Sequence, residues 1–542
     1  MTDFGGTAQT WSLVAFCAAV SFTLLLCVLT GPDSDDLAEF YTGYTYLSPL
    51  RNGLAVAGDY ISAATVLTIG GVIALCGYDG IVLAVSTLLS LLVLMFLLAE
   101  PLRNTGRFTM GDALARRMPG RRVRIVACLV TVAALVPMTL VQLASTGQLV
   151  AYVLGFSHGA LKTGCVIGVG ALMIVYAAIG GMRGTALLHI LKIVALLGSG
   201  VVVAALVLRA FDWSPGALFD AAAARSGAGA AYLGSGLQFA GGTYPRLDMV
   251  STQCAIVLGG ACLPHVTMRM YTAGSAREVR RAMSWAVSSV ALFVLVVTVI
   301  AVGATALVGR AGVMASDPRG NTAYLVGTRA AFGAELSRPE TLLFTAVTTA
   351  VFLTLLASVA SMTLACANSL AHDVIASLRR GMDPVRETFV ARVSAVVVGA
   401  PVVALAALVQ HRSLQPLATV SFCLAASAIA PALVYSLFWR RFTRTGLLWT
   451  LVGGSLAVLL LMPGTRLVSG TPTAAFPEVD LHWFPFTTTA PVSIPLGFLL
   501  GWLGSVLPGR RARREARRVY AAVEPLILAG PESPPPRGRG TA

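Results

Sequence analysis

A short run of small and polar residues interrupts an apolar stretch of the sequence at 58–62 (Gly-Asp-Tyr-Ile-Ser). The surrounding residues, 52–65, otherwise favour a helix that crosses a membrane. In hydrocarbon every backbone amide and carbonyl needs a partner, so such a break is tolerated only where the freed groups face a cavity, protein or an ion. Asp59 adds a carboxylate, which is costly at that depth and usually faces a cavity or a partner. We therefore expect a functional site at this break.

The composition is that of a polytopic membrane protein. Of the 542 residues, 56% are hydrophobic and 12% are charged, and the mean hydropathy of +0.80 lies far outside the range of soluble domains. The net charge of +15 comes mostly from arginines clustered between apolar runs, which suits loops beside an anionic inner leaflet. No basic domain or aromatic-basic motif stands apart, so nucleic acid is not expected as a partner. The cysteines are scattered singly, without metal-ligand spacing.

The apolar runs provide about thirteen membrane-spanning segments, since a span needs roughly 20 apolar residues. They are expected near residues 10–30, 50–76, 79–99, 124–154, 162–182, 186–208, 249–273, 283–308, 341–372, 391–410, 414–438, 446–462 and 488–507. Arginine-rich loops alternate with loops poor in basic residues, and the arginines of short loops lie in the cytoplasm. This pattern predicts a multi-pass protein of the cell (inner or plasma) membrane with its N-terminus outside and its C-terminus in the cytoplasm.

Residues 1–508 are expected to form the transmembrane domain, and residues 509–542 a basic cytoplasmic tail. Within the tail, 510–528 fits either a basic amphipathic helix on the inner leaflet or a solvated charge run. The Pro-rich sequence after Gly530 predicts disorder.

Segments two to six and seven to eleven predict two repeats, at about 50–208 and 249–438, with equal helix number and opposite orientation. In an inverted repeat of this kind the first helix of each unit is broken near the membrane midplane. The seventh segment carries Gly259, Gly260 and Pro264 inside a span, and proline removes a backbone hydrogen bond and clashes with the preceding turn. Close packing or a simple kink is the alternative for each interruption alone. Two interruptions at corresponding positions favour a site between the repeats, with the second break expected at Gly259 and Gly260.

The loop at 99–112 (AEPLRNTGRFTMGD) closely resembles the sodium/solute symporter family, specifically its cation/acetate (monocarboxylate) symporter branch. Further motifs of the resemblance lie at Glu39-Phe40-Tyr41, 52–62, 180–185, Leu263-Pro264-His265, Met268-Arg269, His372-Asp373, 435–439 and 493–498. The resemblance covers about 37 to 505. It implies an all-α, LeuT-like fold of about 13 helices with a five-plus-five inverted-repeat core, and solute uptake by alternating access.

In this family a sodium ion sits between the first helix of repeat one and the third helix of repeat two. The resemblance therefore implies Na⁺ or H⁺ as the coupling ion, and no further cofactor. The cation-binding groups it implies here are carbonyls of Gly58 and Ile61 and groups of Thr354, Ala357 and Ser358. Ala357 departs from the family pattern, because sugar and proline members place adjacent hydroxyl residues there. Thr354 shares a helix face with Ser358 and could supply a hydroxyl instead.

The candidates for substrate binding or coupling are Asp59, Ser62, Gly259, Gly260 and His265. Asp59 either assists the cation or a proton-coupled step, or is paired structurally with an arginine near the mouth of the site. His265 either senses pH or contacts an anion, or is a hydrogen-bonded interior histidine. The positive ends of half-helices near Gly58 and Gly260 could hold a carboxylate through backbone amides.

Other charged residues in or near the spans have plainer interpretations. Arg269 fits snorkelling toward the inner leaflet better than contact with a carboxylate. His189 and Lys192 share a helix face near the inside end of the sixth segment and are interpreted as structural anchors. His372 and Asp373 end the ninth segment, where they either cap a helix or form an inner gate with the loop after the third segment.

The sequence therefore predicts a secondary active transporter that imports a small monocarboxylate, such as acetate, propionate or pyruvate, with Na⁺ or H⁺. A symporter for a different small solute is an alternative, suggested by the atypical stretch 354–361. A transporter-like sensor that acts through a partner is another. An enzyme is not expected, because no nucleophile–base pair, phosphate loop or metal triad is present in the sequence.

Overall fold

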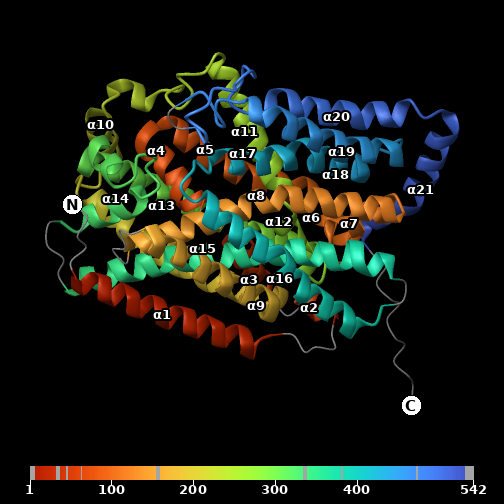
Figure 1. Ribbon diagram of the computed structural model, residues 1–542, viewed down its shortest axis with the longest axis horizontal. Helices are drawn as coiled ribbons and strands as arrows, with labels where there is room; N and C mark the ends of the chain where they lie inside the picture. Colours follow the sequence, from red (N-terminus) through yellow and green to blue (C-terminus); the bar gives the residue numbers. More distant parts are fainter. Residues whose placement is uncertain are drawn as a thin grey trace.

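The computed structural model describes residues 6–31, 37–43, 47–62, 64–153, 159–333, 338–379, 382–471 and 474–530. Within these ranges the chain is helical and forms no strand beyond one isolated β-bridge, between Ser469 and Phe476. Most helices run along one direction as a bundle (Figure 1). A helix satisfies its own backbone groups, which is why a chain this apolar forms a helical bundle. The segment after Gly530, where disorder was predicted, lies outside the described residues.

The α-helices are α1 (Gly6–Leu29), α2 (Leu37–Thr42), α3 (Pro49–Tyr60), α4 (Gly70–Cys76), α5 (Tyr78–Val93), α6 (Ala99–Thr105), α7 (Met110–Arg117), α8 (Arg121–Val153), α9 (Gly159–Arg209), α10 (Pro215–Arg225), α11 (Pro245–Cys262), α12 (Pro264–Met268), α13 (Ala276–Ser316), α14 (Ala323–Ala331), α15 (Arg338–Ser369), α16 (Pro384–Val409), α17 (Gln415–Leu424), α18 (Ala430–Phe438), α19 (Arg444–Leu461), α20 (Ala490–Val506) and α21 (Arg510–Ala529). Short π- or 3-10-helical pieces join them: η2 (Ala64–Ile69), η3 (Leu94–Leu98), η4 (Gly229–Leu233), η5 (Arg269–Thr272), η6 (Leu370–Ala376), η7 (Ala425–Ile429) and η8 (Met462–Gly464).

Nine of the helices in the described part of the chain are long and apolar enough to cross a membrane, or up to 11 if each of two bent helix pairs is one span. One of the nine, α9, has 51 residues and is kinked at Gly181, whose dihedral angles are not helical (φ 52°, ψ −156°). A straight helix of that length would measure ~77 Å, more than twice the ~30 Å of a hydrocarbon core. We therefore assign two of the expected segments, 162–182 and 186–208, to α9. Every expected segment overlaps a described helix, and their exact number stays a prediction.

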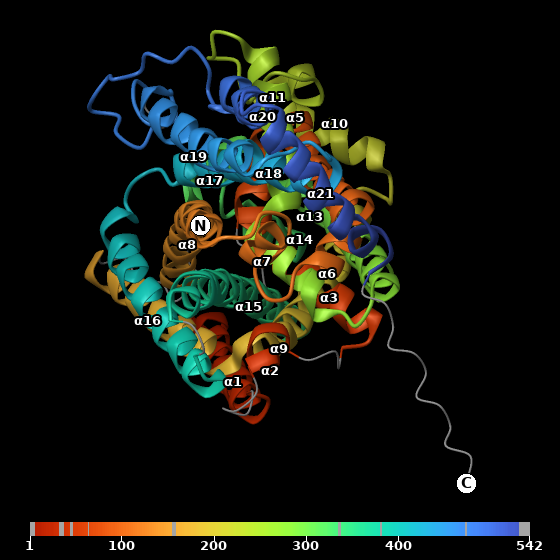
Figure 2. The same ribbon diagram turned by 90° about the vertical axis from the view of Figure 1, so that its right-hand side faces the viewer.

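The middle of the bundle is formed by helices far apart in the sequence. α8 and α15 contact each other there, and α9 packs against both α15 and α3 (Figure 2). α1 and α16 lie on one side of this centre, and the packed pair α19 and α20 lies on the opposite side (Figure 2). Helices of the range expected to be the first repeat, α3 and α9, thus contact helices of the second, α13 and α15.

The first helix that was expected to be broken is broken. α3 ends at Tyr60, and Ile61 leaves the helix with φ −75° and ψ 100°. The axis of Pro49–Tyr60 is bent by 65° from that of Thr65–Cys76. The amide of Ile61 still donates to the carbonyl of Ala57 at 2.9 Å, so the helix ends after Gly58 and Asp59 rather than at them.

The second break lies at a different residue from the one expected. α11 continues through Gly259 and Gly260, and Leu263 (φ −58°, ψ 126°) separates it from α12, which begins at Pro264. Proline lacks an N–H and has a φ suited to the first turn of a helix, so a new helix can begin there. The expectation of a break at the glycine pair was wrong. Gly259 instead permits close packing, because a Cβ there would lie 2.3 Å from the carbonyl oxygen of Phe422.

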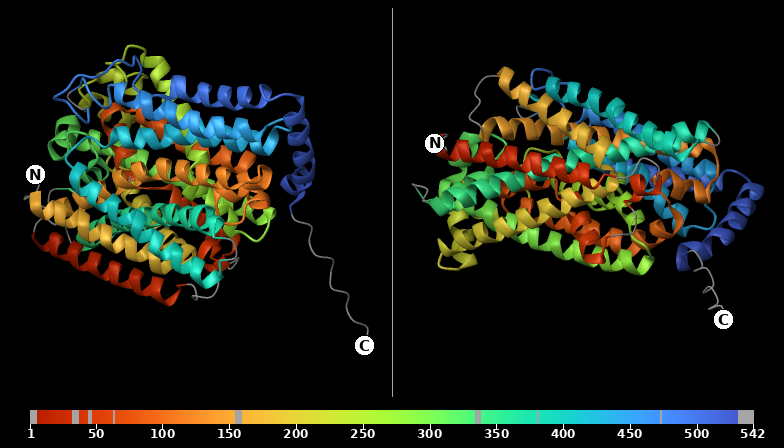
Figure 3. Two further views of the ribbon diagram at one scale, coloured as in Figure 1. Left: turned by 45° about the vertical axis from the view of Figure 1, so that its right-hand side comes forward. Right: turned by 90° about the horizontal axis from the view of Figure 1, so that it is seen from below.

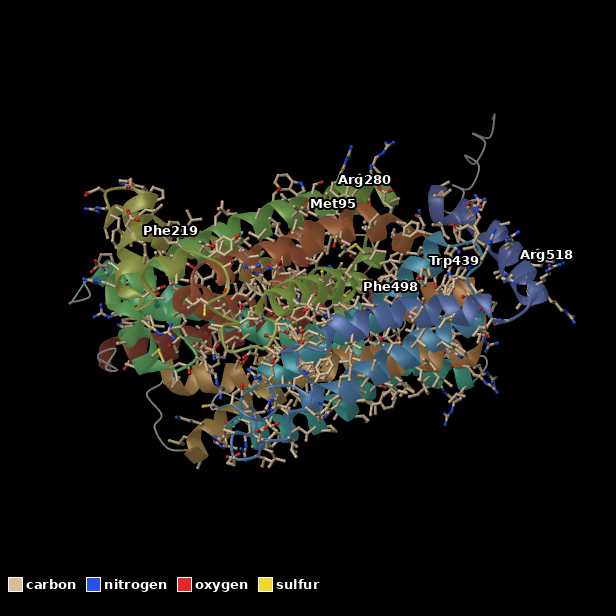
Figure 4. All side chains as sticks on the ribbon, turned by 90° about the horizontal axis from the view of Figure 1, so that it is seen from above. Met95, Phe219, Arg280, Trp439, Phe498 and Arg518 are labelled. Carbon is tan, nitrogen blue, oxygen red and sulfur yellow. The ribbon has the colours of Figure 1, made fainter. Side chains whose placement is uncertain are left out.

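α21 lies across one end of the bundle, at 107° to α20, as both views of Figure 3 show. It contacts α6 and α7, and its buried residues are Ala516, Tyr520, Val523 and Ile527. The amphipathic helix predicted as one alternative for 510–528 is therefore present, and its apolar face packs on the protein itself. Arg280 and Arg518 lie toward this end of the molecule, and Phe219 lies toward the other (Figure 4).

Candidate functional site

The break after α3 turns the carbonyl of Ile61 toward the buried side chain of Lys192 on α9. Lys192 has no exposed surface. Its Nζ donates to the carbonyl oxygen of Ile61 at 3.0 Å, to Oγ of Ser358 at 3.0 Å, and to the carbonyl oxygen of Thr354 at 3.4 Å. Ser358 and Thr354 belong to α15, so one ammonium group joins α3, α9 and α15.

Three of the five residues expected to bind a cation are thus brought together. Ile61, Thr354 and Ser358 surround Nζ of Lys192. The hydroxyl of Thr354 donates to the carbonyl of Ala350 at 2.8 Å. Thr354 therefore presents its carbonyl to the site, and not the hydroxyl that its spacing from Ser358 suggested.

The other two expected cation-binding residues, Gly58 and Ala357, have surroundings that packing explains. A Cβ at Gly58 would lie 2.4 Å from the carbonyl oxygen of His189, so glycine allows α3 to approach the backbone of α9. Ala357 is buried and has no side-chain oxygen. A cation-binding role for this set of residues stays a prediction.

Asp59 is fully buried between two basic side chains. Its Oδ2 accepts a hydrogen bond from Nε of Arg269 at 2.9 Å, and its Oδ1 lies 3.3 Å from Nε2 of His189. The guanidinium of Arg269 also donates to Oγ1 of Thr185 at 3.4 Å and to the carbonyl of Met182 at 3.5 Å. A buried carboxylate is tolerated when it is paired and hydrogen-bonded in this way. The pairing agrees with the alternative that joined Asp59 to an arginine.

Arg269 therefore has a different place from the one expected. It is 1% exposed and lies in η5, directly after α12, which contacts α3. The interpretation of Arg269 as a snorkelling residue was wrong, because its guanidinium is satisfied inside the protein by Asp59 and not by the leaflet.

His265 is another buried member of this cluster, at 3% exposure. Within the described residues its Nδ1 has no hydrogen-bond partner. The ring is close enough to Asp59, Arg269 and Lys192 to interact with them electrostatically. Leaving the histidines aside, the cluster holds two basic side chains and one carboxylate. With Lys192 protonated it carries an excess of positive charge, which attracts anions.

Ser62 and Gly260, also expected at the site, lie beside the two breaks. The amide of Ser62 donates to Oγ1 of Thr65 at 3.2 Å. A Cβ at Gly260 would lie 2.9 Å from the hydroxyl oxygens of Tyr60 and Ser90, which are hydrogen-bonded to each other. Gly260 thus lets α11 approach α3 and α5. A direct role of these residues in holding a solute stays a prediction.

A second charged cluster lies at the end of the bundle that carries α7, and we call it the end network. Nη1 of Arg124 lies 2.7 Å from Oδ1 of Asp112 and 3.2 Å from Oδ1 of Asp373. His372 bridges Asp112 and Glu387, with Nε2–Oδ1 and Nδ1–Oε1 distances of 3.1 Å and 2.7 Å. The contact between the end of the ninth segment and the loop after the third, which was one of two alternatives, is therefore present.

The end network lowers the pKa of Asp112, which lies outside the membrane spans. Burial acts to raise the pKa of Asp112, but the hydrogen bond and positive charge of His372, together with the charge of Arg124, outweigh it. The pKa of Asp112 consequently lies below its ordinary value of 3.8. The carboxylate also accepts from the amides of Phe108 and Thr109 and so caps α7.

Comparison with known proteins identifies the family. Residues 40–454 match the model of the sodium:solute symporter family. The chain belongs to this family. The Monocarboxylic acid transporter of Corynebacterium glutamicum is 34% identical to this symporter over 510 residues, which are 92% of this chain and 91% of that protein. The Uncharacterized symporter YwcA of Bacillus subtilis is 34% identical over 498 residues, 92% of this chain and 94% of that protein.

The fold of this symporter also has a solved counterpart. The structure of a Na⁺-coupled sialic acid symporter matches it with a TM-score of 0.70 at 14% identity, covering 93% of this chain and 98% of the other. The all-α, LeuT-like fold class predicted from the sequence is confirmed. The chain is a multi-pass membrane transporter, and its family membership supports symport coupled to a cation.

Lys192 is the main residue of the site whose position was not predicted, because it was interpreted only as a structural anchor near the inside end of the sixth segment. The chain has two lysines, and Lys192 is the one inside an apolar span, where a charged group is costly and usually functional. That signal was in the sequence. Its partners were not, because Ile61 and Ser358 lie 131 and 166 positions away along the chain.

Proposed function

We propose that this symporter imports a small monocarboxylate, such as acetate, propionate or pyruvate, together with Na⁺ or H⁺. The observation that carries the proposal is the meeting of a broken helix, at Ile61, with the buried cluster of Asp59, Arg269 and Lys192. Broken helices lend carbonyl oxygens to a coupling ion, and the excess positive charge suits an anionic solute. The name of the Corynebacterium glutamicum relative supports the same solute class.

Alternating access gives the end network a role as the inner gate. We place the end that carries α7 and α21 in the cytoplasm and the N-terminus outside, because arginine-rich loops favour the cytoplasmic side. The proposed moving units are the repeats at about 50–208 and 249–438. For a solute to leave inward, the contacts that cross between the repeats, Arg124 with Asp373 and His372 with Asp112, would separate.

Uptake by proteoliposomes tests the function. Labelled acetate and pyruvate are offered to vesicles that contain the purified full chain, with an inward gradient of either Na⁺ or H⁺. Protein-free vesicles are the control, because the neutral form of a small carboxylic acid crosses a bilayer unaided. We expect one of the two gradients to drive accumulation above this control. Binding of the solute without flux would contradict transport and favour a sensor, and failure of both gradients would contradict symport.

A further inference from the structure

Nζ of Lys192 occupies a cage of three oxygens from residues that were expected to bind the coupling cation. The cage consists of two backbone carbonyls, from Ile61 and Thr354, and the hydroxyl of Ser358. We propose that the ammonium of Lys192 takes the place of a coupling sodium ion, and that protons bound and released by Lys192 drive uptake. This inference rests on the proposed symport function and names its coupling ion.

The hydrogen-bond donors of a protonated Lys192 match the acceptors of the cage in number. A protonated lysine has three N–H donors and no acceptor. Nζ meets three oxygen acceptors, at 3.0, 3.0 and 3.4 Å. Hard metal cations in proteins commonly take about six or more oxygen ligands, and Ala357, beside Ser358, has no side-chain oxygen to add. The three oxygens that Nζ contacts therefore match the three donors of an ammonium, and they alone are too few for a metal ion.

A sodium ion and the ammonium exclude each other at this position. Both would need the carbonyl oxygen of Ile61 and Oγ of Ser358. Two like charges that share these ligands would repel each other strongly in a buried site. Lys192 is fully buried and held between α3 and α15. Its ammonium is covalently attached to the protein and therefore occupies the position in preference to a sodium ion from solution.

Within the described residues, no carboxylate forms an ion pair with Lys192. Asp59 on α3 is the carboxylate of the cluster, and Arg269 on η5 already pairs with it at 2.9 Å. His189 on α9 and His265 on α12 are the remaining titratable neighbours, and α15 presents a carbonyl and a hydroxyl. The hydrogen bonds of the ammonium therefore all go to uncharged oxygens. Lysine can exchange its proton at a buried site, whereas arginine stays charged.

The proton step follows from this arrangement. With Nζ protonated, its hydrogen bonds to Ile61, Thr354 and Ser358 are charge-assisted and tie α3 to α15. Release of H⁺ into cytoplasmic water leaves a neutral amine, and the positive charge departs with the proton. The tie between Ile61 and Ser358 then weakens, and the two repeats can separate. Binding of a proton from the outer side restores the tie, so one proton crosses in each cycle.

Uptake of labelled pyruvate into proteoliposomes that contain the full chain tests the assignment. In sodium-free buffer an inward H⁺ gradient should raise wild-type accumulation at least tenfold, and a Na⁺ gradient at equal pH should add nothing. Lys192→Met keeps an unbranched apolar stem but removes the ammonium. It should lose accumulation driven by H⁺ while it still exchanges external labelled for internal unlabelled solute. Lys162→Met, at the other lysine of the chain, is the matched control and should behave as wild type.

Lys192→Arg is the second variant, for use if Lys192→Met does not fold. Arginine retains the positive charge and the hydrogen-bond donors of lysine but does not release its proton. It should exchange solute without accumulating it. Accumulation driven by Na⁺ in the wild type overturns the assignment, as does accumulation driven by H⁺ that survives in either variant. Loss of exchange in both variants also overturns it, since Lys192 would then be a structural tie. Each of these outcomes leaves the proposed symport standing, whereas a wild type with neither exchange nor accumulation contradicts the symport itself.

Discussion

At the scale of single residues, the two buried cations of the site have different partners for chemical reasons. Arg269 holds the carboxylate of Asp59 at 2.9 Å, which suits a planar guanidinium that stays charged. Lys192 has a compact ammonium and binds three oxygens of the cage. The chain thus separates a permanent ion pair from a cation whose charge can change. Exchanging arginine and lysine at these two positions would not be conservative.

Replacement of Asp59 tests the permanent pair. Asp59→Asn should lower the free energy of unfolding by about 3–5 kcal/mol, because it leaves the charge of Arg269 buried without a partner. The measurement is chemical or thermal unfolding of the purified protein in detergent. The double variant Asp59→Asn/Arg269→Leu should lose less than the single variant, since no lone charge stays inside. Wild-type stability in Asp59→Asn would contradict a stabilising ion pair.

At the scale of elements, the sequence reveals the discontinuous helices but not where each one ends. Pro264 marks a real boundary, since a proline starts a helix more readily than it continues one. Gly58 and Gly259 look like similar signals, yet both lie in continuous helix. Because neither residue has a Cβ, Gly58 can lie close to His189 and Gly259 close to Phe422. A local pattern does not distinguish a glycine that unwinds a helix from one that another helix approaches.

The docking of α21 can be tested with two adjacent residues. Ile527 is 2% exposed and Leu528 is 73% exposed, and the carbonyl of Ile527 accepts from Nδ2 of Asn104. Ile527→Asp places an unpaired carboxylate in a buried site, so α21 should detach and trypsin should cleave the arginines of 510–518 faster, by about tenfold if ~1.4 kcal/mol of docking is lost. Leu528→Asp should be cleaved as slowly as the wild type. Equal cleavage of the two variants would show that the apolar face of α21 does not hold it.

At the scale of the whole molecule, polar contacts join the two expected repeats at two depths. Lys192 joins them in the interior through Ile61 and Ser358. Arg124 joins them at the end that carries α7 through Asp373. The sequence indicated the segments that take part in both contacts. It could not pair Arg124 with Asp373, which lies 249 positions away, because that pairing depends on how the helices pack.

The end network should make stability depend on pH through Asp112. Its pKa is lower in the folded protein than in the unfolded chain, where the ordinary value is 3.8, so the carboxylate stabilises the fold above that pH. This contribution is lost as the pH falls below 3.8 toward the folded pKa. The melting temperature of Asp112→Asn should therefore fall less steeply than that of the wild type between about pH 5 and 3. Glu515→Gln, at an exposed carboxylate of α21, should leave the wild-type slope unchanged, and parallel slopes for all three proteins would contradict the role given to Asp112.

The ammonium of Lys192 in the oxygen cage also determines which part of the proton gradient, the membrane voltage or the pH difference, drives uptake. One proton bound at Lys192 and one carboxylate anion together carry no net charge, so membrane voltage does no work on their joint entry. The pH difference alone then sets the limit of accumulation, at about tenfold per pH unit. Such a cell would concentrate the solute in acidic surroundings even with its voltage collapsed, and would gain nothing from voltage when the two sides have equal pH.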